Sequence, residues 1–104
     1  MPVFLNVINN AIYWVGYAKD ERIIKVDIRD DEILIMNSGT KMSHSELTRC
    51  FEIFYTKKAS GRGIGLYLAK KCLNSVALDI YATNDERYNA LGGACFVICD
   101  KNGE

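Results

Sequence analysis

GRGIGLYLAKK, at residues 61–71, places three glycines at alternate positions immediately before a segment with helical character. Glycine costs about 1 kcal/mol relative to alanine in a helix interior. Three of them around a helix start are useful where the backbone takes unusual torsions or where a ligand approaches it closely. Unpaired N–H groups and the positive end of the macrodipole make such a start a phosphate site. The alternative is a flexible loop before an amphipathic helix, and this stretch alone does not decide between the two.

The segments on both sides of these glycines help to decide between a phosphate site and a flexible loop. The helix after it is predicted to run to Leu73, with Leu66, Ala69 and Leu73 on its core side. Before it, aromatic residues at 51, 54 and 55 lead to Lys57 and Lys58. Two lysines beside a phosphate-like helix start would supply mobile positive charge, although an ordinary exposed lysine pair is the alternative.

Residues 2–18 form a second helical segment, and it contains no charged side chain. One predicted stripe is apolar: Phe4, Ile8, Ala11, Ile12 and Val15. A second stripe, on roughly the opposite face, consists of Asn6, Asn10, Tyr13 and Tyr17. Asparagine is a mediocre helix former, and a face that met only water would carry Lys and Glu. We therefore interpret the asparagines as the lining of a polar cavity; the alternative is a pair of core amides satisfied by the backbone.

The remaining pattern predicts strands, turns and one short helix. Residues 24–28 alternate as a half-buried strand with Ile24, Val26 and Ile28 on one side. Residues 29–32 predict a turn, and residues 33–36 its hairpin partner, buried on both faces. Asn37-Ser38-Gly39 ends that strand, and Ser43 or Ser45 offers an N-cap for a helix to about Cys50.

Towards the end of the chain, a strand is predicted at 78–82, a polar connection at 84–93 and a poorly alternating, hence central, strand at 94–99. The expected fold class is α+β: a two-layer α/β sandwich in which helices cover one face of a mixed or antiparallel sheet. With 104 residues and no repeat or linker, we expect one domain over residues 1–104.

Composition narrows the function classes. The formal net charge is zero, which gives no support for a nucleic-acid partner. Four cysteines without C-x-x-C spacing and a single histidine make a zinc site improbable and favour reduced thiols in a cytoplasmic protein. The uncharged first 18 residues contain three asparagines and no basic region before them, so neither a membrane span nor a signal peptide is expected.

Taken together, these segments resemble the ATP-binding domain of sensor histidine kinases, within the gyrase, heat-shock chaperone, histidine-kinase and mismatch-repair (GHKL) ATPase superfamily. Residues 4–14 resemble the N box, residues 35–42 the first glycine box, residues 51–58 the F box and residues 61–66 the second glycine box. Gly92 and Gly93 stand where the family has a closing glycine element. The boxes occur in the family's order, and the resemblance implies the Bergerat-type fold.

The resemblance also implies roles for particular residues. Asn10 would be the Mg²⁺ ligand, and Asn6 would approach the same phosphates one helical turn earlier. Asn37 stands where the family has an aspartate that accepts a hydrogen bond from the adenine amine, and an amide oxygen still accepts, without charge assistance. Gly39 would keep the backbone close to the base. The other residues expected to contact the nucleotide are Tyr13, Met42, Lys57, Lys58, Gly61, Arg62, Gly63, Ile64, Gly65 and Leu66.

Three departures from the family pattern bear on this expectation. Lys41 stands where a second glycine is usual, and Tyr13 stands where kinases often carry a basic residue. The chain also opens at the N box, whereas the family's domain begins with an earlier helix and strand, so we expect an N-terminally truncated domain. Either the sequence is a fragment of a longer protein, or the fold is completed in an unusual way. A sheet edge exposed by that loss would favour a homodimer or strand exchange.

The resemblance implies an ATP- and Mg²⁺-binding catalytic domain that holds ATP for phosphoryl transfer to a histidine on a separate dimerisation domain. The ATP-hydrolysing branches place a glutamate base where this chain has Asn6, so hydrolysis is not expected. His44 lacks the context of a phosphoryl acceptor, and no residue is assigned as catalytic, so the chain is not expected to act alone. The alternatives are a nucleotide-responsive binding module without transferase activity and an ATPase clamp.

Overall fold

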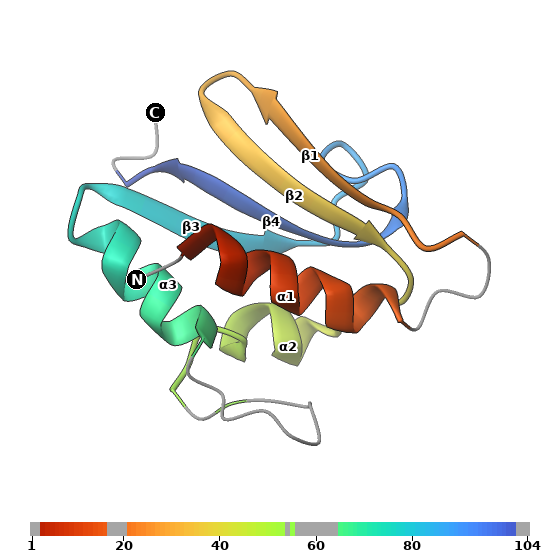
Figure 1. Cartoon of the computed structure of the whole chain (residues 1–104), viewed down its shortest axis with the longest axis horizontal. Helices are drawn as coiled ribbons and strands as arrows, with labels where there is room; N and C mark the ends of the chain where they lie inside the picture. The colour runs from red at the N-terminus through yellow and green to blue at the C-terminus, as the bar shows by residue number, and fades with distance from the viewer. Residues whose placement is uncertain (1–2, 17–20, 54, 56–64, 102–104) are drawn as a thin grey trace.

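Alternating apolar residues build four strands that pair into one antiparallel sheet, in the order β1-β2-β4-β3. The computed structural model describes residues 3–16, 21–53, 55 and 65–101. Figure 1 shows the described helices gathered on one face of this sheet. The elements are α1 (Val3–Val15), β1 (Ile24–Arg29), β2 (Glu32–Ser38), α2 (His44–Arg49), α3 (Gly65–Asn74), β3 (Leu78–Thr83) and β4 (Gly92–Asp100). The predicted α+β sandwich is confirmed, with β4 central between β2 and β3.

The hairpin of β1 and β2 turns through only two residues. Asp30 and Asp31 both have positive φ, 47° and 67°, as a type I′ turn requires, and Arg29 pairs with Glu32 across it. The predicted turn at 29–32 is therefore confirmed. The prediction that one face of β1 is buried is wrong, because Val26 and Ile28 are 46% and 73% exposed. Alternation shows which residues share a face, but β1 is an edge strand and the helix layer does not extend over them.

α1 packs on the sheet through a face that the sequence predicted only in part: Ala11, Val15 and the half-buried Ile8 belong to the predicted stripe. Val7, Ala11 and Val15, spaced four residues apart, are buried, whereas Phe4 and Ile12 are 45% and 53% exposed. The predicted stripe was therefore wrong for Phe4 and Ile12, and it omitted Val7. α1 is apolar around most of its circumference, so its hydrophobic pattern does not single out one face. The smaller Val and Ala side chains lie against the sheet.

α3 follows its sequence pattern. Leu66, Ala69 and Leu73 are all buried, as predicted. Lys70 also ties α3 to β3, since its Nζ lies 2.7 Å from Asp79 Oδ1 and donates to the Ile80 carbonyl at 3.1 Å. These contacts hold the middle of α3 against β3.

α2 begins with a reciprocal capping box. Ser43 Oγ accepts the Glu46 N–H at 3.1 Å, and Glu46 Oε1 accepts the Ser43 N–H at 2.7 Å. Ser43 is therefore the N-cap, which confirms one of the two predicted positions. After α2, Cys50 is buried and the Phe51 ring meets Phe96 of β4 edge to face, with centroids 6.1 Å apart.

The connection between β3 and β4 covers the sheet face opposite the helices. Leu34, Met36, Cys95 and Val97 are buried there against Tyr88 and Leu91. Asn89, only 1% exposed, donates to the carbonyls of Asn37 and Ala94. The segment predicted as a polar connection thus also supplies a second, smaller core.

All four cysteines are free, in agreement with the expected reduced thiols. Burial raises the pKa of the Cys50 thiol to about 12 and that of the Cys95 thiol to about 11, so both stay protonated near neutrality. Within the described ranges, no helix combines the length and the apolar character that crossing a bilayer requires.

Candidate functional site

The asparagine stripe of α1 faces the start of α3. A Cβ built on Gly65 would lie 3.8 Å from Asn6 Cγ and 3.9 Å from Asn6 Oδ1. Asn10 follows one turn later on the same side of α1, and its Oδ1 is buried without a hydrogen-bond partner. Tyr13 is half-buried. The structure thus brings Asn6 and Gly65, which lie far apart in the sequence, next to each other.

Asn37 lies on the helix-covered face of the sheet, near the end of β2. Its side chain is completely buried, and its Nδ2 donates to the Ser38 carbonyl at 2.8 Å. This bond fixes the orientation of the amide, because a flipped amide would place Oδ1 against another acceptor. Asn37 Oδ1 is left buried without a partner. Asn37 therefore presents a fixed hydrogen-bond acceptor inside the protein.

Two neighbours hold the backbone of Asn37 in place. Asn89 Nδ2 donates to the Asn37 carbonyl at 3.2 Å. Gly93 of β4 approaches so closely that a Cβ there would lie 2.2 Å from the same oxygen. Gly93 is thus a glycine because β2 and β4 meet at this point. Sequence reasoning placed it in a closing glycine element but did not find this contact, and it missed Asn89.

The packing of the protein does not explain why the side-chain oxygens of Asn10 and Asn37 are buried without a hydrogen-bond partner. Among the described residues, Asn10 Oδ1 and Asn37 Oδ1 are the buried side-chain polar atoms without a hydrogen-bond partner. Leaving a buried acceptor unsatisfied costs about 1–3 kcal/mol, so each such group calls for a reason. Both atoms can accept a hydrogen bond or coordinate a cation. The arrangement therefore suits a ligand with electropositive groups.

The segment after β2 is held by a side chain that sequence reasoning also missed. Asn84 Oδ1 accepts the Met42 N–H at 3.1 Å, and Asn84 Nδ2 donates to the Met42 carbonyl at 2.5 Å. Met42 is 3% exposed and belongs to the core beneath the helices. Before it, Gly39 takes a φ of 119°, which favours glycine. Nothing in the sequence pattern links positions 42 and 84.

Gly65 differs from Gly39 and Gly93 because the protein itself does not require a glycine there. Its backbone is not left-handed, and an added Cβ would meet only ordinary contacts. Leu66, next to it, is buried in the core. The other predicted residues of this segment, Lys57, Lys58, Gly61, Arg62, Gly63 and Ile64, lie outside the described residues.

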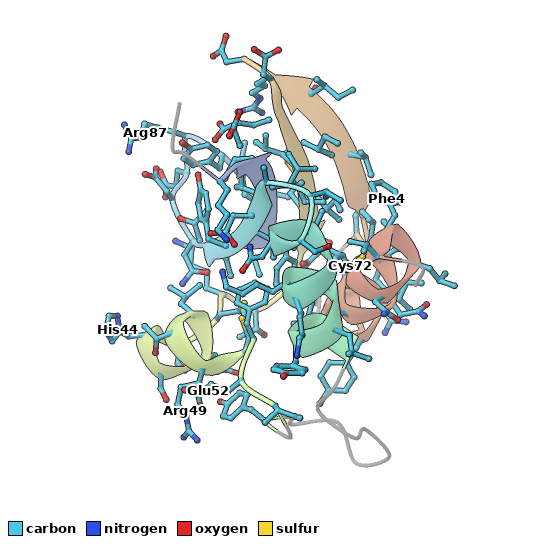
Figure 2. The ribbon with its side chains drawn as sticks, turned by 90° about the vertical axis from the view of Figure 1, so that its left-hand side faces the viewer. Phe4, His44, Arg49, Glu52, Cys72 and Arg87 are labelled. Carbon is cyan, nitrogen blue, oxygen red and sulfur yellow. The ribbon has the colours of Figure 1, made fainter. Side chains whose placement is uncertain are left out.

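The lone histidine lies apart from this arrangement. His44 is exposed at the start of α2, as predicted for a surface residue. Figure 2 shows it projecting outward, on the side of the molecule away from α1. No three described His, Cys, Asp or Glu side chains gather into a metal-binding group.

Comparison with known proteins identifies the family. The sequence profile of the histidine kinase-, DNA gyrase B- and HSP90-like ATPases matches residues 1–101. The chain belongs to this family. The resemblance found in the N box and the glycine boxes is thereby confirmed.

Two relatives of the chain are sensor kinases by name. The chain is 34% identical over 82 residues to sensor histidine protein kinase HK06 of Streptococcus pneumoniae, covering 74% of the chain and 18% of the relative. It is 31% identical over 90 residues to the signal transduction histidine-protein kinase AtoS of Escherichia coli, covering 85% of the chain and 15% of AtoS. The chain thus spans less than a fifth of the length of these relatives.

Solved structures of the same class share the fold. A mycobacterial sensor histidine kinase, MprB, superposes with a TM-score of 0.71 at 22% identity, over 92% of this chain and 65% of that chain. The catalytic domain of histidine kinase ThkA gives a TM-score of 0.65 at 24% identity, over 95% and 64%. This member of the ATPase family therefore has the fold of histidine kinase catalytic domains.

Proposed function

We propose that this chain is the Mg²⁺- and ATP-binding catalytic domain of a sensor histidine kinase, holding ATP for transfer to a histidine on a separate dimerisation domain. One observation carries the proposal. The unpartnered buried oxygens of Asn10 and Asn37 occur at the positions where the family resemblance expects the metal ligand and the adenine acceptor. A bound Mg²⁺–ATP would satisfy both.

Asn10 fits a magnesium site by its chemistry. Mg²⁺ prefers hard oxygen ligands and is usually held by one or two protein groups together with substrate phosphates. Asn10 Oδ1 is such an oxygen and has no competing donor among the described residues. When bound, the ion would neutralise charge on the phosphates, and Asn10 would fix its place on α1.

Asn37 fits the base end of the nucleotide. Because its Nδ2 donates to the Ser38 carbonyl, the orientation of the amide is set and Oδ1 is the unpartnered acceptor that it offers to the ligand. The adenine amine is a donor, whereas the corresponding group of guanine is a carbonyl. We therefore expect Asn37 to favour adenine, with a weaker hydrogen bond than a carboxylate would give.

The start of α3 fits the phosphates. Gly65 lies beside Asn6 without a structural need for glycine, which is explained if a ligand approaches its backbone. The first N–H groups of a ten-residue helix and its macrodipole favour an anion there. Within the proposal, Lys57, Lys58 and Arg62 supply positive charge, and Gly61, Gly63 and Ile64 complete the phosphate loop.

Asn6 and His44 favour a protein that holds ATP over one that hydrolyses it. Asn6 cannot act as a general base towards water, and exposed His44 is remote from α1. Phosphoryl transfer depends mainly on positioning and on charge stabilisation, which this set can supply. The acceptor would be a histidine-bearing dimerisation domain of the same or a partner protein, in the cytoplasm.

The test is phosphoryl transfer in trans. The purified chain would be mixed with the histidine hairpin of a sensor kinase, labelled ATP and Mg²⁺, and acid-labile phosphate on the hairpin would be measured. Transfer should be lost in Asn10→Ala and kept in Asn9→Ala, a matched change of an exposed asparagine on the same helix. Phosphate on His44 of the isolated chain would contradict the proposal.

A second candidate function is a nucleotide-responsive binding module without transferase activity. It is favoured by the neutral amide of Asn37, which weakens the base contact, and by the half-buried Tyr13 in a position that often carries a basic residue. Normal Mg²⁺-dependent ATP binding without any transfer to acceptor hairpins would support this reading over the kinase.

A further inference from the structure

Asn89, in the connection between β3 and β4, makes all its side-chain hydrogen bonds inside the protein. Its Nδ2 donates to the Asn37 carbonyl at 3.2 Å and to the Ala94 carbonyl at 2.8 Å. Its Oδ1 accepts the Leu91 N–H at 2.9 Å. Both donors of the amide are therefore occupied, and the residue is only 1% exposed. Any influence of Asn89 on a bound ligand must pass through the residues that it holds.

One of these residues, Asn37, lies at an irregular point of the sheet. The register between β2 and β4 shifts here, so that Asn37 is opposed by two residues of β4, Gly93 and Ala94. Such a β-bulge interrupts the ladder of backbone hydrogen bonds and changes the direction of a side chain. Asn89 spans the bulge, because its two N–H groups reach one carbonyl on each strand. It thus replaces the backbone donors that the regular ladder would supply.

The direction of the Asn37 side chain depends on this backbone contact. Its Nδ2 donates to the carbonyl of the next residue, Ser38, at 2.8 Å, so the amide is tied to the local backbone. Gly93 leaves little room, since an added Cβ would lie 2.2 Å from the Asn37 carbonyl oxygen and 2.9 Å from Nδ2. A rotation of the peptide that Asn89 holds would therefore move Asn37 Oδ1, the unpartnered acceptor.

The same connection also holds the chain on the far side of Gly39. Asn84 bonds both the N–H and the carbonyl of Met42. Gly39, with a φ of 119°, lies between Met42 and Asn37. Residues 37–42 are thus fixed at both ends by asparagines of one connection, which Figure 1 shows in light blue at the end of the sheet where β2 ends. Asn37 and Met42 are both expected to contact the nucleotide.

We propose that Asn89 is a positioning residue that sets the base selectivity of the nucleotide site. By holding the Asn37 peptide across the bulge, it places Asn37 Oδ1 where this oxygen accepts a hydrogen bond from the 6-amino group of adenine. The inference rests on the proposed ATP site and adds to it a residue that acts without touching the ligand. Inosine triphosphate (ITP) carries a carbonyl in place of that amino group. Asn89 should therefore control the ratio of the affinities for ATP and ITP.

Asn89→Asp isolates the two donors of the amide. The change keeps the shape of the side chain and an oxygen that can accept the Leu91 N–H. It removes both N–H groups and turns a charged oxygen towards the two carbonyls that they satisfied. The Asn37 peptide should then turn away from position 89, and its side-chain oxygen should leave the place where it meets adenine.

The test is calorimetric titration with ATP and with ITP, both with Mg²⁺, at a temperature where a thermal melt shows each variant folded. We expect the parent to bind ATP roughly tenfold more tightly than ITP, the value of about one hydrogen bond. Asn89→Asp should weaken ATP binding by about that factor and ITP binding by less than about twofold, because the phosphates are held by α1 and α3. Val97→Ala, in the core on the opposite face of the sheet, is the control, which loses stability and keeps the preference for ATP.

Asn89→Ser keeps one donor and should lose part of the preference; it also serves as the test variant if Asn89→Asp does not fold. An equal fall in the affinities for ATP and ITP would show a merely structural role and overturn the proposal. The parent's preference in these variants, or a parent that binds ATP no better than ITP, would overturn it as well. In those cases ATP binding itself stands. A folded parent that binds neither nucleotide would overturn the proposed function and this inference with it.

Discussion

Gly65→Ala should make the protein more stable and its nucleotide site weaker. The added Cβ would lie 3.8–3.9 Å from Asn6, which is ordinary van der Waals contact, and the backbone of Gly65 is not left-handed. Replacing glycine by alanine at a compatible helical position stabilises by about 0.4–1 kcal/mol. For a chain of this size that corresponds to a rise in melting temperature of about 2–8 °C.

The affinity of Gly65→Ala for nucleotide should fall, although its stability rises. The same methyl group would stand beside Asn6 at the helix start, where the proposal has phosphates approaching the backbone. We expect the affinity for a non-hydrolysable ATP analogue to fall on the order of tenfold or more, since a displaced charged hydrogen bond costs about 1.5–3 kcal/mol.

The assay pairs a thermal melt without nucleotide with a calorimetric titration of the same sample. Lys71→Ala, an exposed change on the same helix, is the control and should leave the affinity unchanged. A stabilised Gly65→Ala variant that binds the analogue as tightly as the parent would contradict the approach of phosphates to the Gly65 backbone. A destabilised variant would refute the local geometry.

Three further predictions concern stability. Gly93→Ala should lower the melting temperature by about 5 °C or more, measured by circular dichroism, because its Cβ would meet the Asn37 carbonyl at 2.2 Å; a change below about 1 °C would contradict the close approach. Asp31→Gly should raise it by about 5 °C, since φ at this turn residue is 67°, and an unchanged melt would argue against the type I′ turn. Burial raises the pKa of the Asp79 carboxyl, but the hydrogen bonds led by that from Lys70 outweigh it and hold the pKa below the ordinary 3.8. The stabilisation that the Asp79 carboxylate provides is therefore present above pH 3.8 and is lost as the pH falls through the lower folded-state pKa. In Asp79→Asn, the free energy of unfolding measured with urea should depend less steeply on pH in the acid range than in the parent. An equally steep dependence would contradict this.

The elements that the sequence predicted well have a local cause. α3 carries Leu66, Ala69 and Leu73 at helical spacing, so its buried face could be assigned. Ser43 has its capping partner, Glu46, three residues further along the chain. Apart from its asparagine stripe, α1 carries apolar residues on several sides, so periodicity could not show that Val7 is buried and Ile12 exposed. For β1, alternation gave the face of Val26 but could not show that the strand lies at an edge.

The candidate site was likewise predicted only in part from the sequence. The positions of Asn10 and Asn37 followed from the order of the family boxes. That their oxygens are buried and without partners depends on packing between α1, β2 and α3 that no local pattern encodes. The contacts of Asn84 with Met42 and of Asn89 with Asn37 join residues 42 and 52 positions apart, which periodicity cannot detect.

The most direct test of the account is a calorimetric titration of the chain with an ATP analogue, with and without Mg²⁺, alongside Asn10→Ala and the matched Asn9→Ala. We predict Mg²⁺-dependent binding by the parent and by Asn9→Ala, and loss of the Mg²⁺ dependence in Asn10→Ala, because the buried Asn10 oxygen is the proposed metal ligand. Binding that is equally Mg²⁺-dependent in Asn10→Ala, or no binding by the folded parent chain, would contradict it.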